Sequence, residues 1–319
     1  MSRRQDIGAM FGASETETFL GLPKAGDLAT LDAKIAILGA PCATPYPSVG
    51  PYCAAAPKAI RAAIAGYAAN LQHVDFDIGG PIFPGAITAV DGGDLAWTEA
   101  DPASNRSAIR TAVATVVAQG AAPIVIGGDD SVPIPVLEAF HDRGPLTIVQ
   151  IDAHIDWRDE VAGERWGLSS TMRRASEMPH VERIVQVGQR GIGSARPGDL
   201  ADAKAWGALL VPARAVHEHG IAPVLDAVPA GSQVLVTLDC DGLDPAIMPG
   251  VIGPAPGGLT YWQTIGILHG VAAKARIAVF DIVEFVPERD VAGLGALTAA
   301  RIIANVLGLM ARQAAPVPD

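Results

Sequence analysis

Short apolar runs alternate with longer amphipathic stretches along most of this chain, and this alternation predicts strands and helices in turn. The expected strands are residues 34–39, 87–94, 123–126, 146–151, 183–188, 208–211, 233–239 and 276–283. The most regular helical stretches between them are residues 57–70, 105–120, 133–141 and 297–313. Strands that alternate with helices usually form a parallel sheet covered on both faces. The pattern therefore predicts an α/β protein with three layers, α/β/α, and a mostly parallel central sheet.

The first part of the chain lacks this periodicity, so we expect an N-terminal arm at residues 1–32 and a single domain at residues 33–319. Asn105 is a residue type that caps helices well, and we expect it to begin the helix that follows it. The loop from Ala40 to Pro57 contains five prolines and two cysteines. A long irregular loop of this kind is often functional.

Composition narrows the classes of function. The chain has 319 residues, half of them apolar and 18% charged, which is enough for one large core. Its net charge of −11 argues against nucleic acid and anionic membrane surfaces as partners, and fits a small cationic substrate or bound metal ions. The three cysteines are scattered, as in a cytoplasmic protein with free thiols, and no signal peptide or membrane span is evident.

The strand at residues 146–151 runs directly into Asp152-Ala153-His154-Ile155-Asp156. Residues two apart in an extended segment point the same way, so these three polar side chains can share one site. Aspartate and histidine are common metal ligands, but a loop cap with a hydrogen-bonded histidine would use the same residues. This stretch alone leaves both interpretations open.

Two other expected strands also end in acidic clusters, which are Gly127-Gly128-Asp129-Asp130-Ser131 and Asp239-Cys240-Asp241-Gly242-Leu243-Asp244-Pro245. Each cluster could be an ordinary turn or helix cap. However, the carboxyl ends of parallel strands meet at one edge of a sheet, so the clusters can converge. Two carboxylates ~4 Å apart repel by roughly 4 kcal/mol at an effective dielectric near 20, and bound cations relieve this repulsion. The coincidence therefore favours a metal centre, in which two metals could also lower the pKa of a bridging water towards neutrality.

The motifs together resemble the ureohydrolase family, which includes arginase, agmatinase and guanidinobutyrase. The resemblance runs from about Ile35 to Leu307, and it also uses Pro256-Gly257-Gly258-Leu259-Thr260 and Asp281-Ile282-Val283-Glu284-Phe285-Val286-Pro287. It implies an arginase-like fold, two divalent metal ions and hydrolysis of a guanidino group. Oxygen-rich sites with one imidazole suit Mn²⁺, with Ni²⁺ or zinc also possible. The resemblance further implies trimers or hexamers.

Positions matched to the family's motifs give the expected roles. One metal would be held by Asp130, Asp152, Asp156 and Asp239, and the other by Asp152, His154, Asp239 and Asp241. A hydroxide bridging the metals would attack the guanidino carbon, with Asp152 and His154 in the catalytic centre. Glu284 matches the carboxylate that holds the guanidinium, a pairing that suits a planar fork of N–H donors. Without the flanking motif, Glu284 would be an ordinary strand-end glutamate.

The sequence departs from the family's pattern at three places. Asp130 stands where the family has a histidine, and Ser169 stands where it has a proton-shuttle histidine near the substrate. Serine cannot act as an acid or base near neutral pH, so Ser169 is expected only to contact substrate. Cys53-Ala54-Ala55-Ala56-Pro57 replaces a segment in which the family usually has an arginine and a glycine before the proline.

These departures leave two hypotheses. The first is a metal-dependent hydrolase that cleaves a C–N bond of an unusual guanidino or biguanide substrate, resembling agmatinase, guanidinobutyrase or metformin hydrolase. The second is a catalytically impaired subunit that pairs with an active homologue in a hetero-oligomer. Heteromeric members of the family exist among nickel-dependent biguanide (metformin) hydrolases. Metal content and urea or amine release from a guanidine panel would discriminate the two hypotheses.

Overall fold

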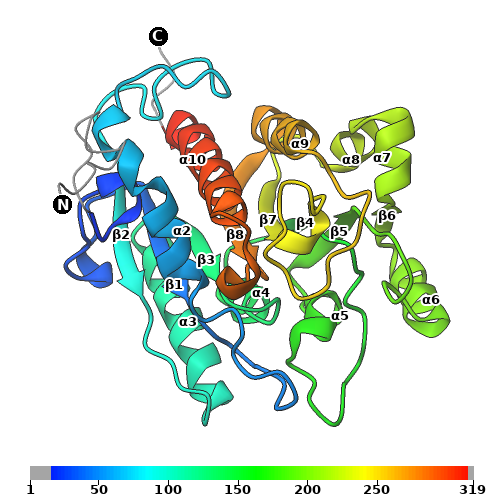
Figure 1. Cartoon of the computed structure of the whole chain (residues 1–319). Coiled ribbons are helices and arrows are strands. Elements are labelled where there is room, and N and C mark those ends of the chain that lie inside the picture. Colours follow the sequence, from blue (N-terminus) through cyan, green and yellow to red (C-terminus); the bar gives the residue numbers. More distant parts are fainter. Residues whose placement is uncertain (1–15, 315–319) are drawn as a thin grey trace, which may run out of the picture.

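The computed structural model describes residues 16–314 and shows an α/β/α domain (Figure 1). Within those residues the strands form one eight-stranded parallel sheet in the order β2-β1-β3-β8-β7-β4-β5-β6. The strands are β1 (Ile35–Ala40), β2 (Ala89–Asp94), β3 (Ala122–Gly127), β4 (Leu146–Ile151), β5 (Val181–Val187), β6 (Leu209–Val211), β7 (Gln233–Asp239) and β8 (Arg276–Val283). Every strand predicted from the sequence coincides with one of these, and the predicted parallel sheet is confirmed.

Helices connect the strands. They are α2 (Ala56–Ile64), α3 (Pro102–Ala118), α4 (Pro133–Glu138), α5 (Thr171–Ser176), α6 (Pro197–Trp206), α7 (Ala213–His219), α8 (Ala222–Ala227), α9 (Tyr261–Lys274) and α10 (Leu294–Ala314). Short 3₁₀ turns are η1 (Phe19–Gly21), η2 (Leu28–Thr30), η3 (Ala65–Asn70), η4 (Leu168–Ser170), η5 (Cys240–Gly242) and η6 (Pro287–Arg289). Because parallel strands need a crossover between them, most of these helices lie on the faces of the sheet.

The sheet is buried on both faces, which explains why its strands are almost continuously apolar. Successive strand residues point to opposite sides, so Ile37 packs in one core with α2, α7, α8, α9 and α10. Its neighbour Leu38 packs in the other core with α3, α4, α5 and α6. By length and composition alone α10 could cross a membrane, but 83% of its most apolar window is buried inside the domain. It is a core helix, and Figure 1 shows it crossing in front of β8.

The described part of the expected N-terminal arm lies against the sheet edge. Phe19 and Leu22 are buried, and the Phe19 backbone N–H donates to the Asp91 carboxylate at 2.7 Å. The same carboxylate pairs with the Arg61 guanidinium at 2.8 Å. Residues 1–15 of the expected arm lie outside the described residues. This contact attaches the segment before β1 to the strand at the edge of the sheet.

The helix predicted at residues 57–70 is an α-helix only to Ile64 and continues as the 3₁₀ turn η3, and the one predicted at 133–141 ends at Glu138. The predicted start of α3 is wrong. α3 begins at Pro102, and its N-cap is Asp101, whose carboxylate accepts from the Ser104 backbone N–H at 3.0 Å. Asn105, the expected cap, is buried inside the helix, where its side-chain amide donates to the Thr98 carbonyl at 2.8 Å. A capping residue type was therefore used for a buried tertiary contact, while an aspartate beside a proline made the cap.

Sheet order determines where side chains from distant parts of the chain meet. The middle strands are β3, β8, β7 and β4. After β3 the chain passes over the positions of β8 and β7 to reach β4. Connections leave these neighbouring strands in opposite directions, which opens a crevice at their carboxyl ends. The three acidic clusters and Glu284 follow these four strands.

Candidate metal centre

Tight local turns bring the acidic clusters together beyond the strand ends. Asp239 ends β7, and its carboxylate accepts from the Asp241 backbone N–H at 2.7 Å, which starts the turn η5. Gly242 closes this turn against β4, where a Cβ atom would lie 2.8 Å from the Asp152 backbone nitrogen. The Ala153 backbone N–H also donates to the Asp241 carboxylate at 3.2 Å. The absence of a side chain at Gly242 thus allows the two clusters to touch.

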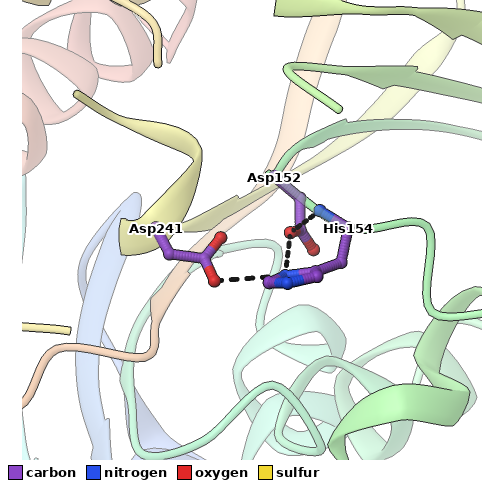
Figure 2. Close-up of side chains that lie close together, drawn as sticks. All are labelled: Asp152, His154 and Asp241. Atoms are coloured by element: carbon purple, nitrogen blue, oxygen red, sulfur yellow. Dashed lines mark hydrogen bonds and ion pairs between the residues drawn. The ribbon is translucent and has the colours of Figure 1, made fainter. Parts of the chain in front are cut away.

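The first group of possible ligands is Asp152, His154 and Asp241, whose side chains point toward one another in Figure 2. One ligand atom from each lies within 4.8 Å of the others. His154 Nδ1 is 3.1 Å from Asp241 Oδ2 and 3.4 Å from Asp152 Oδ1. The His154 backbone N–H also donates to Asp152 Oδ1 at 2.6 Å. An imidazole nitrogen and two carboxylate oxygens are a suitable set for a divalent cation.

The second group is Asp130, Asp152 and Asp239, again with ligand atoms within 4.8 Å of one another. All three residues are buried. Both carboxylate oxygens of Asp130 lack a hydrogen-bond partner in the described part of the chain. A buried carboxylate without partners is costly, so the arrangement fits a bound cation better than a purely structural cluster. Asp152 belongs to both groups and would lie between two metals.

The electrostatics agree with this interpretation. Burial, followed by the charges of neighbouring carboxylates, raises the pKa of Asp130, Asp152 and Asp239 well above the usual aspartate value. Burial also raises the pKa of Asp241, but hydrogen bonding to His154 and its charge outweigh this effect and lower the pKa overall. Burial lowers the pKa of His154, yet its carboxylate partners raise it to about 12. Without metals the cluster must therefore hold protons, and His154 is its internal cation.

Asp156, the last residue of the Asp-x-His-x-Asp stretch, also faces the cluster. Its backbone φ is 50°, in the left-handed region, which turns the chain back toward the sheet end. The Gln150 side-chain amide donates to Asp156 Oδ2 at 2.8 Å and to Asp152 Oδ2 at 2.6 Å. Both aspartates are thus held by one glutamine, which the sequence interpretation counted as part of an apolar strand.

Glu284 follows β8 with a φ of 66°, an unusual backbone conformation for a glutamate and one that recurs at functional sites. Its Oε1 atom accepts from the Asp130 backbone N–H at 2.8 Å. The Tyr52 hydroxyl, from the proline-rich loop, lies 2.8 and 2.9 Å from the two carboxylate oxygens. Burial and the charge of Asp129 raise the pKa of Glu284 to about 8, against the lowering effect of these hydrogen bonds. Sequence reasoning missed Tyr52, and only its place in an irregular loop pointed to it.

These residues surround a cavity of about 250 Å³. Its floor carries Asp130, Asp239, Asp241 and Glu284, and Ser169 and Arg158 also line it. The structure therefore places Ser169 at the pocket, as the sequence alignment with the family expected. Every residue proposed from the sequence as a metal ligand or substrate contact lies in or directly beside this cavity: Asp130, Asp152, His154, Asp156, Ser169, Asp239, Asp241 and Glu284. Their individual roles remain predictions.

The segment that departs from the family's pattern, Cys53–Pro57, begins with a buried cysteine. Cys42, Cys53 and Cys240 are buried free thiols. Burial and the nearby charges of Glu284 and Asp129 raise the pKa of Cys53, so it is a neutral thiol. The segment that departs from the family's pattern thus begins with a small uncharged side chain close to Glu284 and Asp129.

Fold and site together define an α/β/α protein with an acidic, histidine-containing pocket suited to two metal ions. A model of the arginase family matches residues 33–308. The chain belongs to the arginase family, and the resemblance seen in the sequence is confirmed.

Relatives and solved structures agree with this assignment. The agmatinase of Pyrococcus horikoshii is 30% identical over 261 residues, which cover 80% of this chain and 85% of that protein. The mitochondrial agmatinase of Gallus gallus is 33% identical over 205 residues, covering 62% of this chain and 60% of that protein. The chain thus spans only 60% of the Gallus gallus agmatinase, and it spans 53% of mitochondrial arginase 1 of Arabidopsis thaliana. Proclavaminate amidino hydrolase from Streptomyces clavuligerus superposes with a TM-score of 0.81 and 29% identity, covering 94% and 98% of the two chains.

Proposed function

We propose that this protein is a hydrolase that cleaves a C–N bond of a guanidino or biguanide compound with the help of two divalent metal ions. The observation that carries the proposal is that Asp152 belongs to two groups of possible ligands, beside Glu284 and in an arginase-family chain. A guanidinobutyrase from Pseudomonas aeruginosa is among the relatives, at 31% identity over 60% of this chain. The fold places these groups at the open ends of the strands, where substrate can enter.

The residues present fit such metals. Asp130, Asp152, Asp156 and Asp239 would hold one ion, and Asp152, His154, Asp239 and Asp241 the other. The unpartnered oxygens of Asp130 would gain a partner, and the repulsion within the cluster would be neutralised. Mn²⁺ or Ni²⁺ suits this set of oxygen donors with one imidazole. When bound, the metals would supply an activated water as nucleophile.

The chain's own residues would orient the substrate. Glu284 would receive the guanidinium, whose planar N–H groups pair well with a carboxylate, and would hold the group over the ligand cluster. The Tyr52 hydroxyl must then share or leave the Glu284 oxygens that it now contacts. Ser169 offers a hydroxyl at the pocket wall that can orient a substrate atom but cannot exchange a proton near neutral pH.

The test begins with metal content. We expect the purified chain to retain, or to take up, about two Mn²⁺ or Ni²⁺ ions per chain, measured by elemental analysis. The loaded protein is then assayed for urea, ammonia and amine release from agmatine, 4-guanidinobutyrate, arginine and metformin. Asp152→Asn serves as the matched control, because it removes the ligand shared by both groups without changing the shape of the side chain. A protein that binds metal but hydrolyses no guanidine would contradict the proposed activity.

One observation favours a second candidate, a catalytically impaired subunit of a hetero-oligomer. Tyr52 contacts both oxygens of the carboxylate that should receive the guanidinium, while Asp130 and Ser169 replace two histidines expected from the family. In this case the chain alone would be inactive and would raise the activity of an arginase-family partner. Mixing the purified chain with an active homologue, followed by light scattering and assay, distinguishes it from the first candidate. Light scattering of the chain alone also tests the expected trimer or hexamer.

A further inference from the structure

A chain of buried amide groups connects the second core of the domain to the candidate metal ligands. Trp157 Nε1 donates to Gln186 Oε1 at 2.8 Å, and Gln186 Nε2 donates to Gln150 Oε1. Gln150 Nε2 then donates to Asp152 and Asp156 at 2.6 and 2.8 Å. Gln150 and Gln186 are fully buried, and Trp157 is 2% exposed. We call these three side chains the amide relay.

The direction of each hydrogen bond in the amide relay follows from chemistry. An indole N–H can only donate, so the atom of Gln186 that faces Trp157 must be its oxygen. The nitrogen of Gln186 must therefore face the other way, where it donates to the Ile155 carbonyl at 2.9 Å and to Gln150. The oxygen of Gln150 therefore faces Gln186, and both N–H groups of Gln150 are left to donate to Asp152 and Asp156. Trp157 thereby sets the orientation of the Gln150 amide, which it does not contact, through Gln186.

The relay is also complete, because each amide uses both hydrogens and its oxygen. β4 and β5 pair in register at Gln150 and Gln186, so the sheet holds the two glutamines side by side. A flip of either amide would place oxygen against oxygen inside a dry core, which is costly. The two aspartates consequently meet a rigid pair of donors.

We infer that Trp157, Gln186 and Gln150 are positioning residues for the metal centre, because together they orient the Asp152 and Asp156 carboxylates before a metal binds. The inference rests on the metal binding proposed above, but it does not depend on the substrate or on turnover. Partners of metal ligands typically change metal affinity by about 10- to 100-fold when they are removed. Trp157 would exert this effect without touching either aspartate.

The chain offers a matched control for the test. Trp206 packs against Trp157 with ring centroids 6.1 Å apart, and its indole N–H donates at 2.9 Å to the Ser176 carbonyl, outside the relay. Trp157→Phe and Trp206→Phe each remove one indole N–H from this pair of neighbouring rings. Trp206 is only partly buried, so the unfolding temperature of each variant is measured alongside metal binding, and only Trp157→Phe allows Gln186 to flip.

The measurement is the dissociation constant of Mn²⁺, by calorimetry on the full-length metal-free chain, together with the unfolding temperature. We expect Trp157→Phe to weaken Mn²⁺ binding about 10-fold and Trp206→Phe to leave it within about 2-fold. Gln150→Met, which keeps the side-chain length but removes both donors, should weaken it further and serves if Trp157→Phe does not fold. Equal affinities in the two tryptophan variants, or a normal affinity in Gln150→Met, would overturn the inference.

Failure of the proposed function gives a different result. A wild-type chain that binds Mn²⁺ and follows the expected order of affinities, yet hydrolyses no guanidine, supports the amide relay and rejects the enzyme proposal. A wild-type chain without measurable Mn²⁺ binding overturns the relay as a metal-positioning device. Retained guanidine turnover with unchanged affinities in all variants rejects only the relay.

Discussion

The buried carboxylate of Asp130 destabilises the metal-free fold, and under the proposed function it would bind a metal ion. Its carboxylate is buried, has no hydrogen-bond partner in the described chain and lies near Asp152 and Asp239. Asp129, the next residue back, is equally buried but accepts hydrogen bonds from the Ser131 backbone and hydroxyl. Two adjacent aspartates therefore differ in their partners: Asp129 holds the turn, whereas the carboxylate of Asp130 is available for the metal binding proposed above.

Replacement of Asp130 by asparagine separates these roles. We expect Mn²⁺ affinity to fall by about 10-fold or more, because an anionic ligand is lost. The metal-free variant should gain stability on the order of 1 kcal/mol, because the neutral amide no longer repels the other carboxylates. Asp129→Asn is the control, and it should lose stability while metal affinity changes little. Calorimetry and urea unfolding measure both quantities, and a metal-free Asp130→Asn protein less stable than the wild type would contradict this account.

Arg158 concerns the other end of the substrate. It lines the pocket, is half-buried and has no ion pair or side-chain hydrogen bond among the described residues. The cavity therefore has an acidic floor and an unpaired cation on its wall. A guanidino acid, with a cation at one end and a carboxylate at the other, would fit this distribution better than a diamine derivative.

We expect Arg158→Gln to raise the KM for 4-guanidinobutyrate by about 10-fold or more, since a hydrogen bond to a charged group contributes roughly 1.5–3 kcal/mol. The KM for butylguanidine, which lacks the carboxylate, should stay within about 2-fold. Arg165→Gln is a useful control, because Arg165 pairs with Asp159 and lies outside the pocket lining. A wild-type preference for agmatine over 4-guanidinobutyrate would argue against this assignment of Arg158.

At the scale of elements, two residues of similar type have different roles at the start of α3: Asp101 caps the helix, and Asn105 makes a tertiary contact. Asp101→Ala removes only the cap and should cost about 1 kcal/mol. Asn105→Ala should cost more, because it removes a buried side chain and the Thr98 carbonyl and backbone N–H both lose a partner. Urea unfolding with circular dichroism measures the two costs. An Asp101→Ala variant more destabilised than Asn105→Ala would contradict the larger contribution that we assign to the buried Asn105 contacts.

The same comparison shows what the sequence could and could not predict. Strand positions followed from local apolar runs, and the convergence of Asp130, Asp152 and Asp239 followed from the rule that parallel strand ends share one edge. Tyr52 and Gln150 could not be found in that way. Tyr52 reaches Glu284 across 232 residues of sequence, and the Gln150 amide is hydrogen-bonded to Gln186 on the neighbouring strand. Such contacts depend on sheet order and side-chain direction, which local periodicity does not contain.

For the whole molecule, the acidic cluster predicts an unusual dependence of stability on pH. Folding raises the pKa of Asp130, Asp152 and Asp239, raises that of Glu284 from 4.5 to about 8, and raises that of His154 from 6.5 to about 12. The native metal-free protein therefore binds more protons than the unfolded chain. Its free energy of unfolding must fall as pH rises through this range, by about 1.4 kcal/mol per pH unit for each proton involved.

We expect the metal-free protein to be less stable at pH 8 than at pH 5.5, as measured by urea unfolding in the presence of a chelator. The metal-loaded protein should lose less stability over the same range, because bound cations favour the deprotonated ligands. It should also bind Mn²⁺ more tightly as pH rises. A metal-free protein that gains stability between pH 5.5 and pH 8 would show that the cluster does not hold protons.

The sheet order also has a consequence for how the chain folds. Asp130 and Glu284 are 154 residues apart in sequence, and Ala153 and Asp241 are 88 apart, yet each pair is hydrogen-bonded. Closing such long loops costs entropy before any contact repays it, and chains dominated by distant contacts fold slowly. The four middle strands must dock before the acidic ends can meet. Metal ions would thus find their complete set of ligands only at the end of folding, and would act by slowing unfolding rather than by guiding assembly.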